Sequence, residues 1–209
     1  MDDAIAAVFA LYEQRMAAEA ELWRTPKPGL TRDDFLLAVG PSTGALMNTI
    51  AKDAGARHIV EIGTSYGYST VWLAEAARAT GGKVTTLDVA AKKQAYARDM
   101  LEKAGLAAFV EFRNGDALEL IPQLEDGIDF VLLDCWKDVY VGCLDRFHPK
   151  LAPGAVVVAD NMVRPADAHA DAIAYRRAVR AKPDMTSILL SVGSGLEISR
   201  KAGPLDADL

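Results

Sequence analysis

The chain has 209 residues, which is the length of one globular domain. Hydrophobic residues make up 51% and charged residues 25%, so the composition excludes a disordered chain and a collagen-like fibre. With 23 Lys and Arg against 29 Asp and Glu, the net charge is −6. Because no basic cluster stands out, we expect neither nucleic acid nor a membrane surface as a partner.

The N-terminal segment has the pattern of an amphipathic helix that ends before Pro26 and Pro28. The apolar residues at helical steps are Ile5, Val8, Phe9, Tyr12, Met16 and Trp23. We expect this stripe to pack on the rest of the domain. Contact with a second copy of the chain, as in a homodimer, is the sharper alternative.

The sequence carries few signs of export. Residues 4–11 are apolar but lack the basic lead-in of a signal peptide, and the apolar runs are too short to span a bilayer. The two cysteines, Cys135 and Cys143, form neither a disulfide framework nor a zinc pattern. We therefore expect a cytoplasmic protein.

A second helix is expected at 43–54, and short apolar strands then alternate with helices. The strands are expected at 58–62, 83–88, 109–112, 129–134 and 155–160, and the helices at 68–80, 91–104, 118–124, 139–151 and about 167–181. This alternation predicts a parallel sheet covered by helices on both faces. The segments 185–190 and 196–200 lie too close together for a crossover helix and predict an antiparallel hairpin.

The predicted fold class is therefore α/β: a single Rossmann-like, doubly wound sheet, mostly parallel, with a C-terminal antiparallel hairpin and an N-terminal helical extension. No shift in composition marks a domain boundary. We treat residues 1–209 as one domain, with N-terminal helices at 1–55, the core at 56–201 and a tail at 202–209.

Acids gather where the predicted strands end. Asp88, Asp134 and Asp160 end the second, fourth and fifth strands, and Asn161 follows the last of them. In open α/β sheets the ligand lies beyond the carboxyl ends of the strands. A purely structural sheet has no need for so many like charges at one rim. The pattern indicates a ligand site.

The turn after the first strand narrows the class of ligand. Residues 63–67 read G-x-x-x-G, whereas the dinucleotide fingerprint G-x-G-x-x-G needs a second glycine where this chain has Ser65. The turn suits a nucleoside ligand without a pyrophosphate, and Asp88 is placed to bind ribose hydroxyls. A glycine turn alone is weak, but together with Asp88 it favours a nucleoside site.

Asp134, Asp160 and Asn161 offer hard oxygen donors at neighbouring strand ends. Such donors suit Mg²⁺ or another hard divalent cation such as Mn²⁺ or Ca²⁺. The alternative is that Asp160 and Asn161 cap the next helix, and the three residues alone leave both interpretations open. Zinc is disfavoured because no His and Cys set accompanies them.

Lys137 follows Asp134 by three residues and is a candidate general base, because burial and a nearby cation both favour the neutral amine. The ordinary alternative is a solvated surface lysine. Trp136 is a candidate to flank a purine or an aromatic substrate, with core packing as its alternative.

Three segments carry a family resemblance. Residues 60–69, 129–140 and 159–161 resemble the cofactor turn, the metal-and-base segment and the second metal pair of the cation-dependent class I S-adenosylmethionine O-methyltransferases. That family includes catechol O-methyltransferase and the caffeoyl-CoA O-methyltransferases. The resemblance covers about residues 40–201, and its middle segment is the specific one.

The resemblance implies a role for each matching position. The implied S-adenosylmethionine contacts are Val39, Gly40, Glu61, Gly63, Ser65, Ser69, Asp88, Val89, Gly115, Asp116, Ala117, Asp134 and Trp136. Asp134, Asp160 and Asn161 would hold the metal, and Lys137 would be the base. Two positions depart from the pattern: Cys135 stands where the catechol enzyme has His, and no late substrate-binding Glu is identified, although Glu197 lies in the last predicted strand.

The expected function is Mg²⁺-dependent methyl transfer from S-adenosylmethionine to a small phenolic molecule with vicinal hydroxyls. A nicotinamide-dependent oxidoreductase, which Ser65 and Tyr66 disfavour, is one alternative. A non-catalytic nucleoside-binding domain and a metal-independent methyltransferase are the others. A homodimer is expected because the tail resembles that of the caffeoyl-CoA branch.

Overall fold

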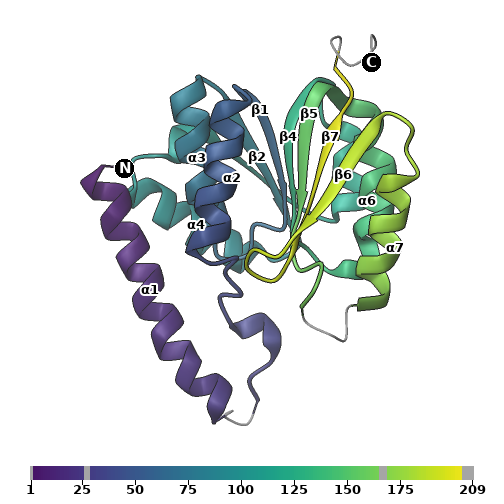
Figure 1. Ribbon diagram of the computed structural model, residues 1–209. Coiled ribbons are helices and arrows are strands. Elements are labelled where there is room, and N and C mark those ends of the chain that lie inside the picture. The colour runs from purple at the N-terminus through teal and green to yellow at the C-terminus, as the bar shows by residue number, and fades with distance from the viewer. Residues whose placement is uncertain (1, 26–28, 165–168, 204–209) are drawn as a thin grey trace.

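The computed structural model describes residues 2–25, 29–164 and 169–203 and is built around one seven-stranded sheet (Figure 1). The strands are β1 (His58–Ile62), β2 (Lys83–Asp88), β3 (Val110–Asn114), β4 (Ile128–Leu133), β5 (Leu151–Ala159), β6 (Met185–Leu190) and β7 (Leu196–Lys201). The α-helices are α1 (Asp3–Arg24), α2 (Pro41–Asp53), α3 (Tyr68–Thr80), α4 (Ala91–Lys103), α5 (Ala117–Leu120), α6 (Tyr140–Phe147) and α7 (His169–Arg180).

The strand order is β3-β2-β1-β4-β5-β7-β6. The first five strands are parallel, and β7 runs antiparallel to both β5 and β6. The connection reverses direction between β1 and β4, so the switch point of the sheet lies there. This arrangement confirms the predicted fold class, including the C-terminal hairpin.

Successive side chains of a strand point to opposite faces of the sheet, and helices cover both faces. Ile59 and Phe130 pack into a core with α1, α2, α3 and α4. Val60 and Val131 pack into a second core with α6, α7 and the turn after α5. The runs of Val, Ile and Leu in the sequence are therefore explained by burial on two sides.

Two predicted helices are shorter than expected. The segment 118–124 divides into α5 and a 3₁₀ turn η3 (Ile121–Gln123), and the segment 139–151 divides into η4 (Lys137–Val139), α6 and η5 (His148–Lys150). A proline stands at the start of both η3 and η5, where its missing N–H ends the preceding α-helical ladder. The predicted helix at 167–181 is α7, and residues 167–168 lie outside the described part.

Helix α1 confirms the N-terminal prediction and shows where its stripe goes. Ile5, Val8, Phe9 and Tyr12 are buried against the domain, and the Phe9 ring lies 4.5 Å from the Trp72 ring of α3. Figure 1 shows that the C-terminal half of α1 runs past the edge of the sheet where β1 ends. Of the other two members of the predicted stripe, Met16 is half-buried and the Trp23 side chain lies outside the described part, and the homodimer stays a prediction. Among the described residues, no helix has the length and apolarity needed to cross a bilayer.

Candidate active site

The turn between β1 and α3 lies at the switch point and is held there by close packing. Gly63 has φ +107°, and a Cβ at that position would lie 2.1 Å from the Asp134 carbonyl oxygen, so no side chain fits. Gly67, with φ +86°, precedes α3 and packs on Ala97 of α4. Ser65 has φ +45°, a conformation that costs a non-glycine residue energy. The turn is thus a narrow, fixed loop beside the end of β4.

Asp88 ends β2 and ties this turn to the neighbouring strand. Its two carboxylate oxygens accept hydrogen bonds from the backbone N–H groups of Ser65 and Ala90, each at 2.7 Å. A carboxylate has about four lone-pair sites, so capacity for hydroxyl donors remains. The predicted ribose residue therefore lies at the carboxyl edge with its orientation fixed.

Glu61 lies beneath the turn and is fully buried. Its carboxyl accepts hydrogen bonds from the hydroxyls of Ser69, Thr70 and Thr86, all at 2.6 Å. Burial raises the pKa of Glu61 to about 7, although these hydrogen bonds oppose the shift. These hydrogen bonds join the start of α3 to β1 and β2. Glu61 and Ser69 therefore hold the turn in place from the core side.

The other residues predicted to hold a cofactor lie at the same edge. Gly40 precedes α2 with φ +84°, Asp116 caps α5 by accepting from the Leu118 N–H at 2.8 Å, and Gly115 follows β3. Val89 and Trp136 are 66% and 52% exposed. Their exposure leaves both side chains accessible to a ligand at this edge. The remaining two members of the predicted set, Val39 and Ala117, adjoin Gly40 and Asp116 in the chain.

Two acids lie where β4 and β5 end: Asp160 is buried, and the Asp134 side chain is 17% exposed. The Asp134 N–H donates to the Ile62 carbonyl at 2.9 Å and the Asp160 N–H to the Leu133 carbonyl at 3.1 Å, which fixes both residues just past the last strand positions. Burial raises the pKa of Asp134. Burial, together with the Asp134 charge, raises the pKa of Asp160 to about 7. Two acids that disfavour each other's ionisation form a site that a cation would stabilise.

Lys137, at the start of η4, faces these acids. Its Nζ lies 3.8 Å from an Asp134 oxygen and donates to Asn161 Oδ1 at 3.0 Å and to the Cys135 carbonyl at 3.1 Å. The Lys137 side chain is only 9% exposed, so the interpretation as a solvated surface lysine is wrong. Asn161 has φ +58°, and its N–H donates to Asp160 Oδ1 at 2.6 Å.

Tyr140 completes this cluster and was missed at the level of sequence. Its oxygen accepts from Lys137 Nζ at 2.5 Å, and its hydroxyl donates to the Leu133 carbonyl at 2.8 Å. Tyr140 is fully buried on α6, and burial raises its pKa well above the ordinary value. Its spacing of three residues from Lys137, one helical turn, is the signal that would have indicated the contact.

The donor set fits a hard divalent cation. Asp134 and Asp160 offer carboxylate oxygens and Asn161 an amide oxygen, which are the ligand types that Mg²⁺ prefers. Within the described ranges, no three His, Cys, Asp or Glu side chains are placed to hold a metal ion together, so this set of two acids and one amide differs from a typical zinc centre. A Mg²⁺ ion keeps several waters and needs only one or two protein carboxylates.

Glu197 does not belong to this site. It is fully buried on β7, where Arg180 and Arg176 of α7 donate to it at 2.8 and 3.2 Å and the Ser187 hydroxyl donates at 2.6 Å. This network anchors α7 to the sheet. A buried carboxylate with two arginine partners is a structural ion pair and no counterpart of a substrate-binding Glu.

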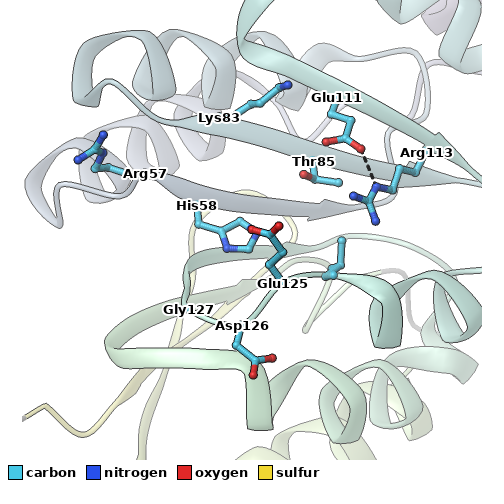
Figure 2. Close-up of a pocket in the computed structure, with 10 residues that line it drawn as sticks. Arg57, His58, Lys83, Thr85, Glu111, Arg113, Glu125, Asp126 and Gly127 are labelled. Carbon is cyan, nitrogen blue, oxygen red and sulfur yellow. Dashed lines mark hydrogen bonds and ion pairs between the residues drawn. The ribbon is translucent and has the colours of Figure 1, made fainter.

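A groove of about 400 Å³ lies at the opposite, amino edge of the sheet (Figure 2). It is lined by Arg57, His58, Lys83, Thr85, Glu111, Arg113, Leu124, Glu125, Asp126 and Gly127. Its charges have both signs, and Glu111 pairs with Arg113 at 2.8 Å. Because α/β enzymes bind ligands at the carboxyl ends of strands, we do not assign this groove to the active site.

The sheet order, the G-x-x-x-G turn and the acid that ends β2 together define a class I methyltransferase domain. A family model described as a methyltransferase domain matches residues 60–162. The catechol O-methyltransferase of Mycobacterium tuberculosis is 36% identical over 150 residues, which are 69% of this chain and 68% of that protein. The catechol O-methyltransferase of Niastella koreensis is 34% identical over 132 residues, which are 61% of this chain and 59% of that protein.

A solved structure agrees with these relatives. The O-methyltransferase from Bacillus cereus in complex with SAH has a TM-score of 0.74 and 26% identity over 96% of this chain and 91% of that one. The chain belongs to the class I, S-adenosylmethionine-dependent O-methyltransferases. This membership sets aside the two alternatives of a nicotinamide-dependent oxidoreductase and a non-catalytic nucleoside-binding domain.

Proposed function

We propose that this chain transfers a methyl group from S-adenosylmethionine to one hydroxyl of a small phenolic molecule with vicinal hydroxyls, with the help of a hard divalent cation. Mg²⁺ is the first candidate. The observation that carries the proposal is the cluster of Asp134, Asp160, Asn161 and Lys137, which lies beside the turn after β1. Catechol and caffeoyl thioesters represent the acceptor class.

The methyl donor would lie along the turn at residues 63–69. Asp88 would accept hydrogen bonds from the ribose hydroxyls, since its position is fixed by Ser65 and Ala90. Val89 and Trp136, both exposed, would flank the adenine beside the 115–117 segment. Val39 and Gly40, at the start of α2, and Ser69, at the start of α3, would face the methionine end.

Asp134, Asp160 and Asn161 would hold the cation. Bound there, such a cation would lower the pKa of a phenolic hydroxyl and fix its orientation. Asp160 is buried, Asp134 is largely shielded from solvent, and the Asp134 charge makes ionisation of Asp160 more costly; a cation would offset that cost. A metal-independent route would leave this pair of acids without a function.

Lys137 would take the proton from the acceptor hydroxyl. The three acceptors around Nζ, the Cys135 carbonyl, Tyr140 oxygen and Asn161 Oδ1, hold the amine at a fixed point beside the acids. The resulting phenolate would then attack the sulfonium methyl in line, so that the O–CH3 bond forms as the S–CH3 bond breaks and S-adenosylhomocysteine leaves. Holding the acceptor hydroxyl and the methyl donor in this alignment would supply a large part of the rate gain.

The test is a panel of acceptors, each assayed with S-adenosylmethionine and either Mg²⁺ or EDTA. The panel contains catechols, flavonoids, hydroxycinnamoyl thioesters, and the matching phenols with a single hydroxyl. We expect turnover with vicinal hydroxyls and Mg²⁺, and its loss in EDTA. Equal turnover of the single-hydroxyl phenols, or full activity after thorough chelation, would contradict the proposal.

A further inference from the structure

We propose that helix α1 positions the methyl-donor site through Tyr12 and Arg15, so that the N-terminal helix belongs to the donor site as well as to the core. The inference rests on the proposed function. Tyr12 is fully buried, and both side chains contact Tyr66, so both act through the turn at residues 63–67. They are therefore positioning residues.

Tyr12 makes the first link. Its hydroxyl donates a hydrogen bond to the carbonyl of Tyr66 at 2.7 Å, and its side chain is fully buried. Tyr66 lies between Ser65, with φ +45°, and Gly67, with φ +86°. The backbone N–H groups of this loop already bond to β2, to Asp88 and within the loop, and the Tyr12 hydroxyl adds a bond to the Tyr66 carbonyl at the centre of the loop.

Arg15 makes the second link, one helical turn further along α1. Its guanidinium lies 3.7 Å from the centre of the Tyr66 ring and 5.0 Å from the centre of the Tyr96 ring. A planar cation against aromatic rings is a favourable contact that is stronger when partly desolvated. The Arg15 side chain is 22% exposed. Arg15 thus fixes the side chain of the same loop residue whose carbonyl Tyr12 holds.

Glu19 extends the link to the other half of the donor site. One of its oxygens accepts from Arg15 Nε at 2.7 Å, and the other accepts from the Leu36 N–H at 2.7 Å. The Ser65 hydroxyl reaches the Leu36 carbonyl at 3.4 Å. Leu36 leads, within four residues, to Gly40 at the start of α2. One pair of side chains on α1 therefore joins both segments proposed to face the donor.

The geometry predicts that loss of these links affects donor affinity more than the rate of methyl transfer. Without these links the loop at 63–67 and the segment at 35–40 gain conformational freedom, which donor binding must then remove. Donor affinity should fall. The reacting groups, Lys137 and the acids, lie on the segments after β4 and β5, so the rate at saturating donor should change little.

The experiment compares Tyr12→Phe, Arg15→Met and Arg15→Lys with Arg24→Met as the matched control. Arg24 is on the same helix and also pairs with a glutamate, Glu21 at 2.8 Å, but both side chains are about three-quarters exposed at 73% and 74%. We would measure the affinity for S-adenosylhomocysteine by calorimetry, kcat at saturating S-adenosylmethionine, and hydrogen exchange of the amides at 63–67.

We expect Arg15→Met to weaken S-adenosylhomocysteine binding about tenfold and Tyr12→Phe about fivefold, as expected for the loss of one such contact. Exchange at 63–67 should quicken, and kcat should stay within about twofold of wild type. Arg15→Lys should not rescue binding, because an ammonium does not stack as a guanidinium does. Arg24→Met should match wild type.

Unchanged affinity and exchange in both Tyr12→Phe and Arg15→Met would overturn the inference, whatever happens to the melting temperature. A wild-type protein that fails to bind S-adenosylhomocysteine would instead overturn the proposed function on which it rests. The two failures are distinguished by the wild-type titration alone.

Discussion

The two edges of the sheet both carry charge, but they carry it differently. At the amino edge, the groove in Figure 2 mixes basic and acidic side chains, and its acids are open to water: Asp126 is 83% exposed. At the carboxyl edge, Asp160 is 1% exposed and its nearest charges are another acid and Lys137. Exposed charges of both signs cost little folding free energy, whereas like charges shielded from water are destabilising unless a partner such as a cation compensates them. Burial, rather than charge, therefore distinguishes the site.

The largest effect expected from this difference is at Asp160. Replacing Asp160 by Ala removes a proposed cation ligand and should lower turnover about 10³-fold or more, since a Lewis-acid cation is worth several kcal/mol. The matched substitution at the other edge, Asp126→Ala, should leave turnover at the wild-type level. Circular dichroism establishes that both variants fold, and steady-state assays with Mg²⁺ give the result. Equal turnover of the two variants would contradict the distinction between the edges.

The next largest effect is expected at Lys137. Lys137→Ala should reduce kcat by about 10²–10⁴-fold, the usual range for loss of a general base, while affinity for the methyl donor barely changes. Lys137→Arg should not rescue, because a guanidinium stays protonated. Lys83→Ala in the amino-edge groove is the control and should be neutral. A Lys137→Arg enzyme with near-wild-type kcat would show that this residue supplies charge or position only.

A smaller effect is expected at Asp88. Asp88→Ala should weaken S-adenosylhomocysteine binding by about 1.5–3 kcal/mol for each charge-assisted hydrogen bond lost. Part of the loss would come through Ser65, whose N–H bonds to Asp88 at 2.7 Å. Glu125→Ala, at the amino edge, serves as the control. Calorimetry that gives the same affinity for Asp88→Ala and wild type would remove Asp88 from the donor site.

The smallest effect concerns stability against pH in the absence of cations. Burial raises the pKa values of Glu61 and Asp160 to about 7, above their ordinary values, so the folded protein holds protons that the unfolded chain releases. Stability should therefore be greatest below about pH 4 and should fall by an amount on the order of 2 kcal/mol for each acid between about pH 5.5 and 7, above which it levels off.

Urea denaturation in EDTA at pH 5.5, 7 and 8.5 measures this slope. Glu61→Gln should flatten it, whereas Glu111→Gln, at the amino edge, should not. Mg²⁺ should restore stability at pH 8.5 in the wild type, because a cation favours the ionised form of Asp160. Stability that rises steadily over this range in EDTA would show that the two buried acids do not control it.

The sequence predicts the order and type of the strands and helices well, because these depend on local patterns. Strand β4 is an apolar run buried on both faces, and the spacing of β6 and β7 permits only a hairpin. Helix ends were less predictable. The segment at 139–151 has a helical pattern throughout, yet α6 ends at Phe147, and Pro149 follows in η5.

The part of the site that lies at the strand ends is predictable from the sequence. Asp88, Asp134 and Asp160 were identified because the carboxyl ends of parallel strands meet at one edge. The contact of Tyr12 with Tyr66 joins residues 54 positions apart and depends on how α1 packs, which no local pattern reveals. Whether Lys137 is buried was also beyond the sequence, since it depends on α6 and the strand ends packing around it.

The most direct test of the account is a calorimetric titration of Mg²⁺ into the S-adenosylhomocysteine-loaded protein. We predict one binding event in the wild type and in Asp126→Ala, and none in Asp160→Ala. Absence of binding in the wild type, or binding that persists unchanged in Asp160→Ala, would contradict the claim that the acids at the carboxyl edge form a cation site beside the methyl donor.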